Sequence, residues 1–138
     1  MWETVLEASP GQRQITFNLS HSGEWVLAIF ASRQAVGIDV QEMGEISEYM
    51  EIAKNFFTEE EATEIQKTES PERFLSVLGS KKKAYLKALG IGLNKGMDFF
   101  SVRENKIIEK GKIKSGWKLY PILIKDYAAY AAVQEKGR

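Results

Sequence analysis

Lysine side chains at three nearby positions offer the chemistry of an anion-binding site. Lys82, Lys83 and Lys87 fall within six consecutive residues, and an ammonium group donates charge-assisted hydrogen bonds to phosphate oxygens. Lys83 and Lys87 are four residues apart, so on a helix they share a face and repel each other mildly. One interpretation is an ordinary solvated basic surface. The other is that these lysines surround a polyphosphate.

Lys82 differs from its two neighbours. If residues 71–89 are helical, Lys82 lies in the middle of the apolar stripe that Phe74, Leu75, Leu78, Tyr85, Leu86 and Leu89 form. Burying an ammonium group there is costly unless it reaches water or an anion. On geometry alone, we expect the Lys82 side chain to extend along the apolar surface and reach water at the edge of the domain.

Asp39 and Gln41 offer oxygen atoms that could hold a hard cation. They alternate with Val36, Ile38 and Val40, so on a strand they point to the opposite face from these apolar residues. Mg²⁺ is usually held by one or two carboxylates together with phosphate oxygens, which makes Asp39 a candidate ligand. The alternative is an aspartate at the end or edge of a strand with no ligand.

His21 is the one histidine of the chain, in the segment Ser20-His21-Ser22-Gly23. An imidazole flanked by hydroxyl groups can bind a phosphate, or it can simply order a turn.

Alternating and helical patterns predict the elements that must position these side chains. Strands are predicted over Ile15–Leu19, Trp25–Ala31, Val36–Gln41, Phe99–Arg103, Trp117–Ile124 and Tyr127–Val133. Residues 47–66 are expected to form two helical pieces, the second opened by a capping box from Thr58 to Glu61. A further helix is predicted over Pro71–Leu89, with Gly90 ending it. The pattern predicts one α+β domain with an antiparallel sheet packed against helices.

Composition excludes several classes of function. The 138 residues carry 19 basic and 19 acidic side chains, so no overall charge directs the protein to nucleic acid or a membrane surface. The absence of cysteine and the single histidine exclude thiolate and multi-histidine metal sites. With no long apolar run and no signal-peptide pattern, we expect a cytoplasmic protein that binds neither nucleic acid nor membrane.

Four segments, taken in order, resemble motifs of the surfactin-synthetase-activating class of 4'-phosphopantetheinyl transferases. They are Phe17–Val26 (FNLSHSGEWV), Val36–Gln41 (VGIDVQ), Phe56–Glu61 (FFTEEE) and Lys82–Leu93 (KKAYLKALGIGL). The likeness extends over residues 15–133, and the order and spacing of the motifs agree with the family. The alternative is an unrelated α+β interaction domain, which would require all four motif matches to be accidental.

The resemblance implies a fold, an activity and a set of site residues. It implies transfer of the 4'-phosphopantetheine arm of coenzyme A to a serine of an acyl or peptidyl carrier protein. It places Ser20 and His21 on the phosphates of coenzyme A, Lys82 and Lys87 on its pyrophosphate, and Mg²⁺ on Asp39 and the Gln41 position. The catalytic set it implies is Asp39, Lys83 and Lys87.

Three positions depart from the family pattern. Gln41 and Lys83 stand where the family has glutamates, and Gly79 stands where it has tryptophan. The formal charge of the expected carboxylate triad thereby moves from −3 to 0, which weakens the Mg²⁺ site. Two hypotheses follow: an active transferase with an altered site, in which Lys83 takes over part of the role of the ion, or a pseudoenzyme that binds coenzyme A or a carrier protein.

The length of the chain implies how the site is completed. Residues 1–14 are expected to be an N-terminal extension and residues 15–138 the transferase-like domain, which resembles the C-terminal lobe of two-lobed family members. A single lobe leaves one sheet face and half of the cleft uncovered. We therefore expect a homodimer or homotrimer.

Overall fold

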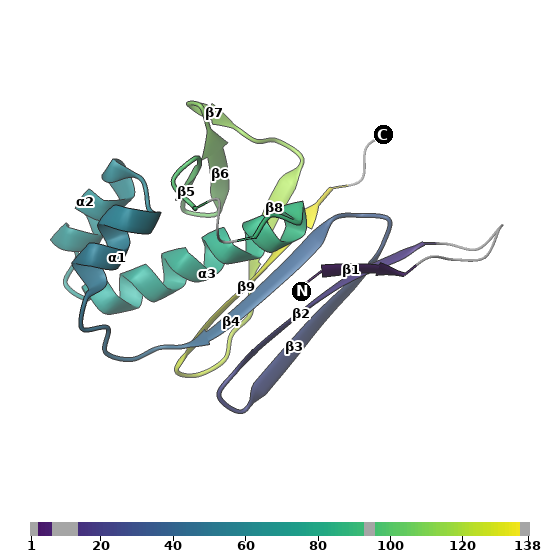
Figure 1. The fold of residues 1–138 in the computed structure, drawn as a ribbon, viewed down its shortest axis with the longest axis horizontal. Coiled ribbons are helices and arrows are strands. Elements are labelled where there is room, and N and C mark those ends of the chain that lie inside the picture. The colour runs from purple at the N-terminus through teal and green to yellow at the C-terminus, as the bar shows by residue number, and fades with distance from the viewer. Residues whose placement is uncertain (1–2, 7–13, 93–95, 136–138) are drawn as a thin grey trace.

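The protein is an α+β structure of three helices and three small antiparallel sheets over the part that can be described (Figure 1). The computed structural model describes residues 3–6, 14–92 and 96–135, so most of the expected extension 1–14, Leu93 of the last motif and the three C-terminal residues lie outside it. The elements are β1 Glu3–Leu6, β2 Ile15–Ser22, β3 Trp25–Ser32, β4 Val36–Glu42, α1 Tyr49–Phe56, α2 Glu59–Lys67, α3 Pro71–Leu89, β5 Ser101–Arg103, β6 Lys106–Glu109, β7 Lys112–Ile113, β8 Trp117–Pro121 and β9 Tyr127–Gln134.

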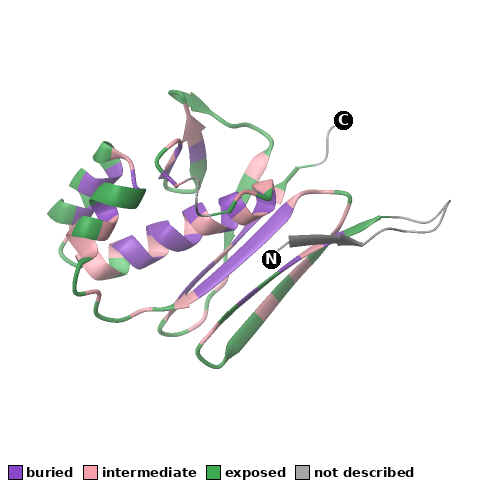
Figure 2. Ribbon diagram, in the orientation of Figure 1, coloured by how far each residue is buried: buried purple, intermediate pink, exposed green. Residues whose placement is uncertain are grey.

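Helix α3 is the central element and lies along β4 and β9 (Figure 1). Proline at its first turn favours its start, and Gly90 ends it in the left-handed conformation, at φ 74°. In the described chain, neither α3 nor any other helix is long and apolar enough to cross a membrane. The helix is mostly buried along its length (Figure 2), so its position decides which side chains can meet the strands beside it.

Glycine and alanine residues let α3 approach the sheet closely. A Cβ atom on Gly37 of β4 would lie 2.1 Å from the Ala84 carbonyl oxygen and 2.5 Å from the Ala88 nitrogen. The neighbouring strand β9 contributes four buried alanines, Ala128, Ala129, Ala131 and Ala132. Small side chains on both strands therefore allow the helix backbone to rest almost directly on the β4 backbone.

The main core lies on the other side of α3, where it meets the two shorter helices and the C-terminal strands. Tyr85 of α3 is buried there, with its ring centroid 4.9 Å from that of Phe100 and 5.0 Å from that of Trp117, both in edge-on geometry. Edge-on aromatic pairs are favourable beyond the apolar area that they bury. This cluster ties α3 to β8 and to the loop before β5.

Strand β2 joins the first sheet to β4 through side chains instead of a backbone ladder. The acceptors are Asn18 Oδ1, Ser20 Oγ and Ser22 Oγ, which receive the N–H groups of Ile38, Val40 and Glu42 at 2.9, 3.0 and 3.0 Å. Each bond spans 20 residues of sequence, so the two strands run in the same direction. These side chains satisfy the N–H groups along the free edge of β4, which would otherwise be left without partners.

The opposite face of this first sheet is apolar and open. Phe17 and Phe30 stack across β2 and β3 with centroids 5.7 Å apart, and Phe30 is 65% exposed. Leu19 and Val26 are also exposed, and Figure 2 shows the run of exposed positions along β3. Exposed apolar patches on protein surfaces are candidate interaction sites.

The predicted elements agree well with the observed ones. The helix at Pro71–Leu89 is confirmed residue for residue, and the capping box at Thr58 is confirmed. The two helical pieces expected over residues 47–66 are observed at Tyr49–Phe56 and Glu59–Lys67. The short strands β1, β6 and β7 were not predicted, because two- to four-residue strands carry too little alternation to stand out. Strand β1 pairs with β2, although the boundary between an extension at 1–14 and a domain from 15 stays a prediction.

Candidate active site

The polar side chains singled out in β2, β4 and α3 meet at one cleft. Its cavity has a volume of about 430 Å³, and its polar lining residues are Ser20, His21, Ser22, Asp39, Gln41, Lys83 and Lys87. Leu86 and Ile91 add apolar walls. Segments separated by up to about 70 residues of sequence thus converge because α3 lies against β4, and β2 against the other edge of β4.

Lys87 is fixed at the junction of all three elements. Its Nζ donates to the Leu19 carbonyl of β2 at 2.8 Å and to the Ile38 carbonyl of β4. Burial lowers the pKa of Lys87 to about 8, the Asp39 carboxylate opposes this shift, and the neighbouring Lys83 ammonium adds to it. Lys87 is therefore a positioned cation that titrates close to neutral pH.

Asp39 provides the one carboxylate among the residues that line this cleft. It is only 8% exposed, and burial raises its pKa, while Lys83, Lys87 and hydrogen bonds from Ser80 and Gln41 act in the opposite direction. The Ser80 hydroxyl oxygen lies 3.2 Å from the main-chain carbonyl oxygen of Asp39. The carboxylate thus shares the cleft with two ammonium groups that favour its charged form, while its burial increases its affinity for a proton.

Gln41 presents a donor to Asp39. Its Nε2 lies 3.1 Å from the Ser76 carbonyl and 3.4 Å from Asp39 Oδ2. Because the Ser76 carbonyl can only accept, the Gln41 amide nitrogen is the atom that must face it. The same nitrogen therefore faces the carboxylate, and the amide oxygen, the atom that could bind a metal, points elsewhere.

The residues of this cleft do not fit Mg²⁺. Over residues 14–92 and 96–135, no three histidine, cysteine, aspartate or glutamate side chains come together in a metal-binding cluster. Asp39 is left as a single carboxylate beside two ammonium groups and an amide donor. Mg²⁺ prefers several oxygen ligands in octahedral geometry, and two lysines would repel it.

Ser20 and His21 both lie at the cleft, as the resemblance implied, but they differ in environment. Ser20 is 5% exposed and accepts the Val40 N–H, so its oxygen also holds β2 against β4. His21 is exposed and alternates to the other face of the strand pair, opposite Val26 of β3. Both side chains line the cavity wall, and their contact with phosphate stays a prediction.

Lys82 points away from this cleft, and our expectation that it reaches water is wrong. The side chain is fully buried, and its Nζ lies 2.5 Å from Glu61 Oε1 and 2.8 Å from the Phe100 carbonyl. Phenyl rings of Phe57 and Phe100 flank the ammonium at 5.2 and 4.6 Å. A carboxylate supplied by another helix satisfies the buried charge, so water is not needed and the pyrophosphate role implied for Lys82 has no support from its position.

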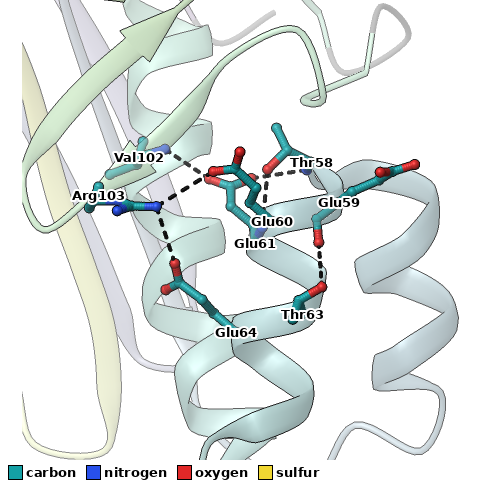
Figure 3. Close-up of polar contacts among 8 residues, drawn as sticks. All are labelled: Thr58, Glu59, Glu60, Glu61, Thr63, Glu64, Val102 and Arg103. Atoms are coloured by element: carbon teal, nitrogen blue, oxygen red, sulfur yellow. Dashed lines mark hydrogen bonds and ion pairs between the residues drawn. The ribbon is translucent and has the colours of Figure 1, made fainter. Parts of the chain in front are cut away.

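Glu61 is the residue that sequence reasoning did not connect to Lys82. Figure 3 shows its carboxylate receiving the N–H groups of Thr58, at 3.1 Å, and Val102, at 2.8 Å. The capping box revealed one of these bonds in advance. A lysine in the middle of an apolar stripe was the signal that its ammonium needed water or an anion, and Glu61 supplies the anion.

Comparison with known proteins agrees with this arrangement. Residues 35–132 match the model of the 4'-phosphopantetheinyl transferase superfamily. The chain is 40% identical over 89 residues to the 4'-phosphopantetheinyl transferase Sfp of Bacillus subtilis and 36% identical over 108 residues to a 4'-phosphopantetheinyl transferase of Bacillus pumilus. These matches cover 63% and 75% of this chain, but only 38% and 45% of the two relatives.

Solved structures share the fold. A holo-(acyl-carrier-protein) synthase from Bacillus anthracis, crystallised in complex with coenzyme A (3',5'-ADP), superposes with a TM-score of 0.60 at 22% identity. That match covers 75% of this chain and 96% of the other. The holo-[acyl-carrier-protein] synthase of Thermotoga maritima gives a TM-score of 0.57 at 23% identity, over 75% of this chain and 64% of the other. With the family model matched over most of its length, the chain belongs to the 4'-phosphopantetheinyl transferase superfamily.

Proposed function

We propose that this protein transfers the 4'-phosphopantetheine arm of coenzyme A to a serine of an acyl or peptidyl carrier protein. The observation that carries the proposal is the cleft in which Lys83 and Lys87 of α3 face Asp39 of β4. Relatives named 4'-phosphopantetheinyl transferases support it, as does the coenzyme A complex of the Bacillus anthracis synthase. Because the chain spans less than half the length of the first two relatives, activity is the property to be tested.

The cleft offers groups of the right charge for coenzyme A. Two ammonium groups and one carboxylate give the cavity a net positive charge at neutral pH, which suits a diphosphate. His21 and the Ser20 hydroxyl lie on the β2 side of the cavity, where they would meet phosphate oxygens. Lysines act here as point charges and do not require a bidentate geometry.

The proposed reaction is one phosphoryl displacement. The carrier serine oxygen attacks the β-phosphorus of coenzyme A, a new P–O bond forms, and the bond from that phosphorus to the bridging oxygen breaks. Adenosine 3',5'-bisphosphate leaves with the bridging oxygen, and its new negative charge is offset by Lys83 and Lys87. Asp39 is the carboxylate of the cavity, and its raised pKa makes it the proposed acceptor of the serine proton.

We further propose that the open apolar face of β2 and β3 is covered by a second copy of this chain, as a homodimer or homotrimer. Leu19 and Phe30 on this face are 42% and 65% exposed, and the face lies on the same strand, β2, that lines the cleft. Light scattering is expected to show an oligomer at micromolar concentration. Phe30→Glu should shift the mass to that of a monomer, whereas a wild-type monomer would contradict the proposal.

The transfer activity is tested directly by mass. The protein is incubated with coenzyme A and several apo-carrier proteins, in Mg²⁺ and separately in EDTA, and each carrier is weighed intact. Addition of the arm in either condition supports the proposal, and Asp39→Asn is expected to slow it at least about 100-fold, the lower end of the contribution of a general base. Absence of transfer from folded protein to every carrier would leave the pseudoenzyme hypothesis.

A further inference from the structure

Lys83 lines the cleft with Asp39, and no hydrogen bond to a described residue fixes its ammonium group. Its charge interacts with both Asp39 and Lys87, and its side chain is half-buried at the boundary between two cavities. Lys87, by contrast, is held by two strand carbonyls. Lys87 is thus the anchored cation of the pair.

The donor set around Lys83 suits an anion and repels a divalent cation. Gln41 turns its amide N–H toward Asp39 Oδ2 at 3.4 Å, so a further hydrogen-bond donor faces the carboxylate. An ammonium group carries three hydrogen-bond donors and one positive charge. It can therefore contact Asp39 on one side and phosphate oxygens on the other, which is the bridging position that a metal ion takes at a phosphate site.

We propose that the Lys83 ammonium replaces the divalent cation of this cleft, so that the diphosphate of the substrate binds between Lys83 and Lys87 without a metal. Asp39, the proposed acceptor of the serine proton, then interacts electrostatically with Lys83 and is not a metal ligand. The identity of the ligand as coenzyme A rests on the proposed function, but the independence from metal rests on the Asp39, Gln41 and Lys83 arrangement alone.

Calorimetric titration of the purified full chain with coenzyme A tests this inference without measuring activity. We expect dissociation constants in EDTA and in millimolar Mg²⁺ to agree within about threefold, apart from the small effect of ionic strength. Binding that is more than tenfold tighter in Mg²⁺ would overturn the inference and leave the proposed function intact. Absence of binding in both conditions would overturn both.

Lys83→Glu should convert the cleft from metal-independent to Mg²⁺-dependent binding of the diphosphate. It places a second carboxylate beside Asp39, so coenzyme A binding in EDTA should weaken at least tenfold, and Mg²⁺ should restore most of the loss. Lys83→Met removes the charge without adding a ligand, so its binding should be weak in both conditions. If Lys83→Met binds coenzyme A as tightly as the wild type in EDTA, Lys83 does not hold the diphosphate and the inference fails.

Arg73→Glu is the matched control. Arg73 is an exposed residue of the same helix, ten positions earlier and so about 15 Å away along the axis. It undergoes the same change of charge outside the cleft. Coenzyme A binding by Arg73→Glu should stay within about twofold of the wild type and show no requirement for Mg²⁺, while an effect equal to that of Lys83→Glu would attribute the result to net charge.

Discussion

Lysines on the two sides of helix α3 lie in contrasting environments. On the side facing α2 and β5, Lys82 is fully buried and its ammonium meets Glu61 at 2.5 Å. On the side facing β4, Lys83 and Lys87 line an open cavity with Asp39. The residues are neighbours in sequence, but the 100° turn between consecutive helical positions sends them into different surroundings.

The difference lies in what each carboxylate has around it. Glu61 receives two backbone N–H groups as well as the Lys82 ammonium, so its position is determined by three partners and it has no room for a ligand. Asp39 shares its cleft with two ammonium groups, so its side of the helix carries an excess of positive charge. Breaking the closed pair would leave an unpaired buried charge, whereas the open group of charges has room for a ligand.

The largest expected effect comes from breaking the closed pair. Lys82→Met leaves the Glu61 carboxylate buried without a counterion, and such a change costs about 3–5 kcal/mol of unfolding free energy. The total stability of a domain is about 5–15 kcal/mol, so the loss should be plain in urea unfolding. The double variant Lys82→Met/Glu61→Gln should recover about 1 kcal/mol or more, since a neutral amide can still accept the Val102 N–H.

Lys83→Met is the control for this comparison. It makes the same substitution one residue later, on the cleft side, and is expected to change stability by less than about 0.5 kcal/mol. If Lys82→Met and Lys83→Met lose equal unfolding free energy, the two sides of α3 do not differ as proposed.

The approach of α3 to β4 gives the next effect. Gly37→Ala would place a Cβ atom 2.1 Å from the Ala84 carbonyl oxygen, which forces the helix away from the strand. We expect a loss of about 3 kcal/mol, at the upper end for overpacked cores, together with weaker coenzyme A binding because Lys83 and Lys87 move with the helix. A loss below about 0.5 kcal/mol in thermal or urea unfolding would contradict this close contact.

Titration of Lys87 should affect binding and stability in opposite directions. Its pKa falls from 10.5 to about 8 in the folded chain, so the cleft loses positive charge as pH rises through about 8. Coenzyme A binding should weaken by about tenfold, or about 1.4 kcal/mol, between pH 7 and pH 9.5. Over the interval from about 8 to 10.5 the unfolded chain binds more protons than the folded one, so this group makes stability rise with pH.

Lys87→Met separates this effect from other titrations. Calorimetry across the same pH range should give weaker binding that no longer changes near pH 8. If the wild-type pH dependence persists in Lys87→Met, another group is responsible.

A smaller and opposite effect is expected at Gly79. A Cβ atom there would lie 3.6 Å from Gln41 Nε2 and from Phe57 Cζ, which is ordinary contact. Alanine should stabilise the helix interior by about 0.5–1 kcal/mol, raising the midpoint of thermal unfolding. Destabilisation would show that the cavity beside Gln41 and Lys83 cannot accept even a methyl group.

The smallest effect is expected at an exposed ion pair close to the buried one. Arg103 lies 3.5 Å from Glu60 and 3.8 Å from Glu64 (Figure 3), but all three side chains are more than half exposed. Arg103→Ala should cost no more than about 0.5 kcal/mol. If Arg103→Ala lowers the free energy of unfolding as much as Lys82→Met does, burial is not what makes the two ion pairs differ in their effect on stability.

Local sequence determined both ends of α3 and the start of α2. The proline at the first position of α3, the left-handed Gly90 and the Thr58–Glu61 capping box are signals that act within a few residues, so they could be recognised before the fold was known. The family motifs likewise brought Ser20, His21, Asp39 and Lys87 together as candidates, and the structure places all four at one cleft.

Tertiary structure alone decided the direction and partner of each charged side chain. The apolar stripe predicted that Lys82 lies toward the core, but not that Glu61, 21 residues earlier, would meet it. Nor did sequence show that Ser20 holds the edge of β4 or that Gln41 turns its N–H toward Asp39. The physical reason is the same in each case: a local pattern determines the face from which a side chain leaves its element, whereas the free energy of a buried charge or donor depends on groups that only the packed fold brings within hydrogen-bonding distance.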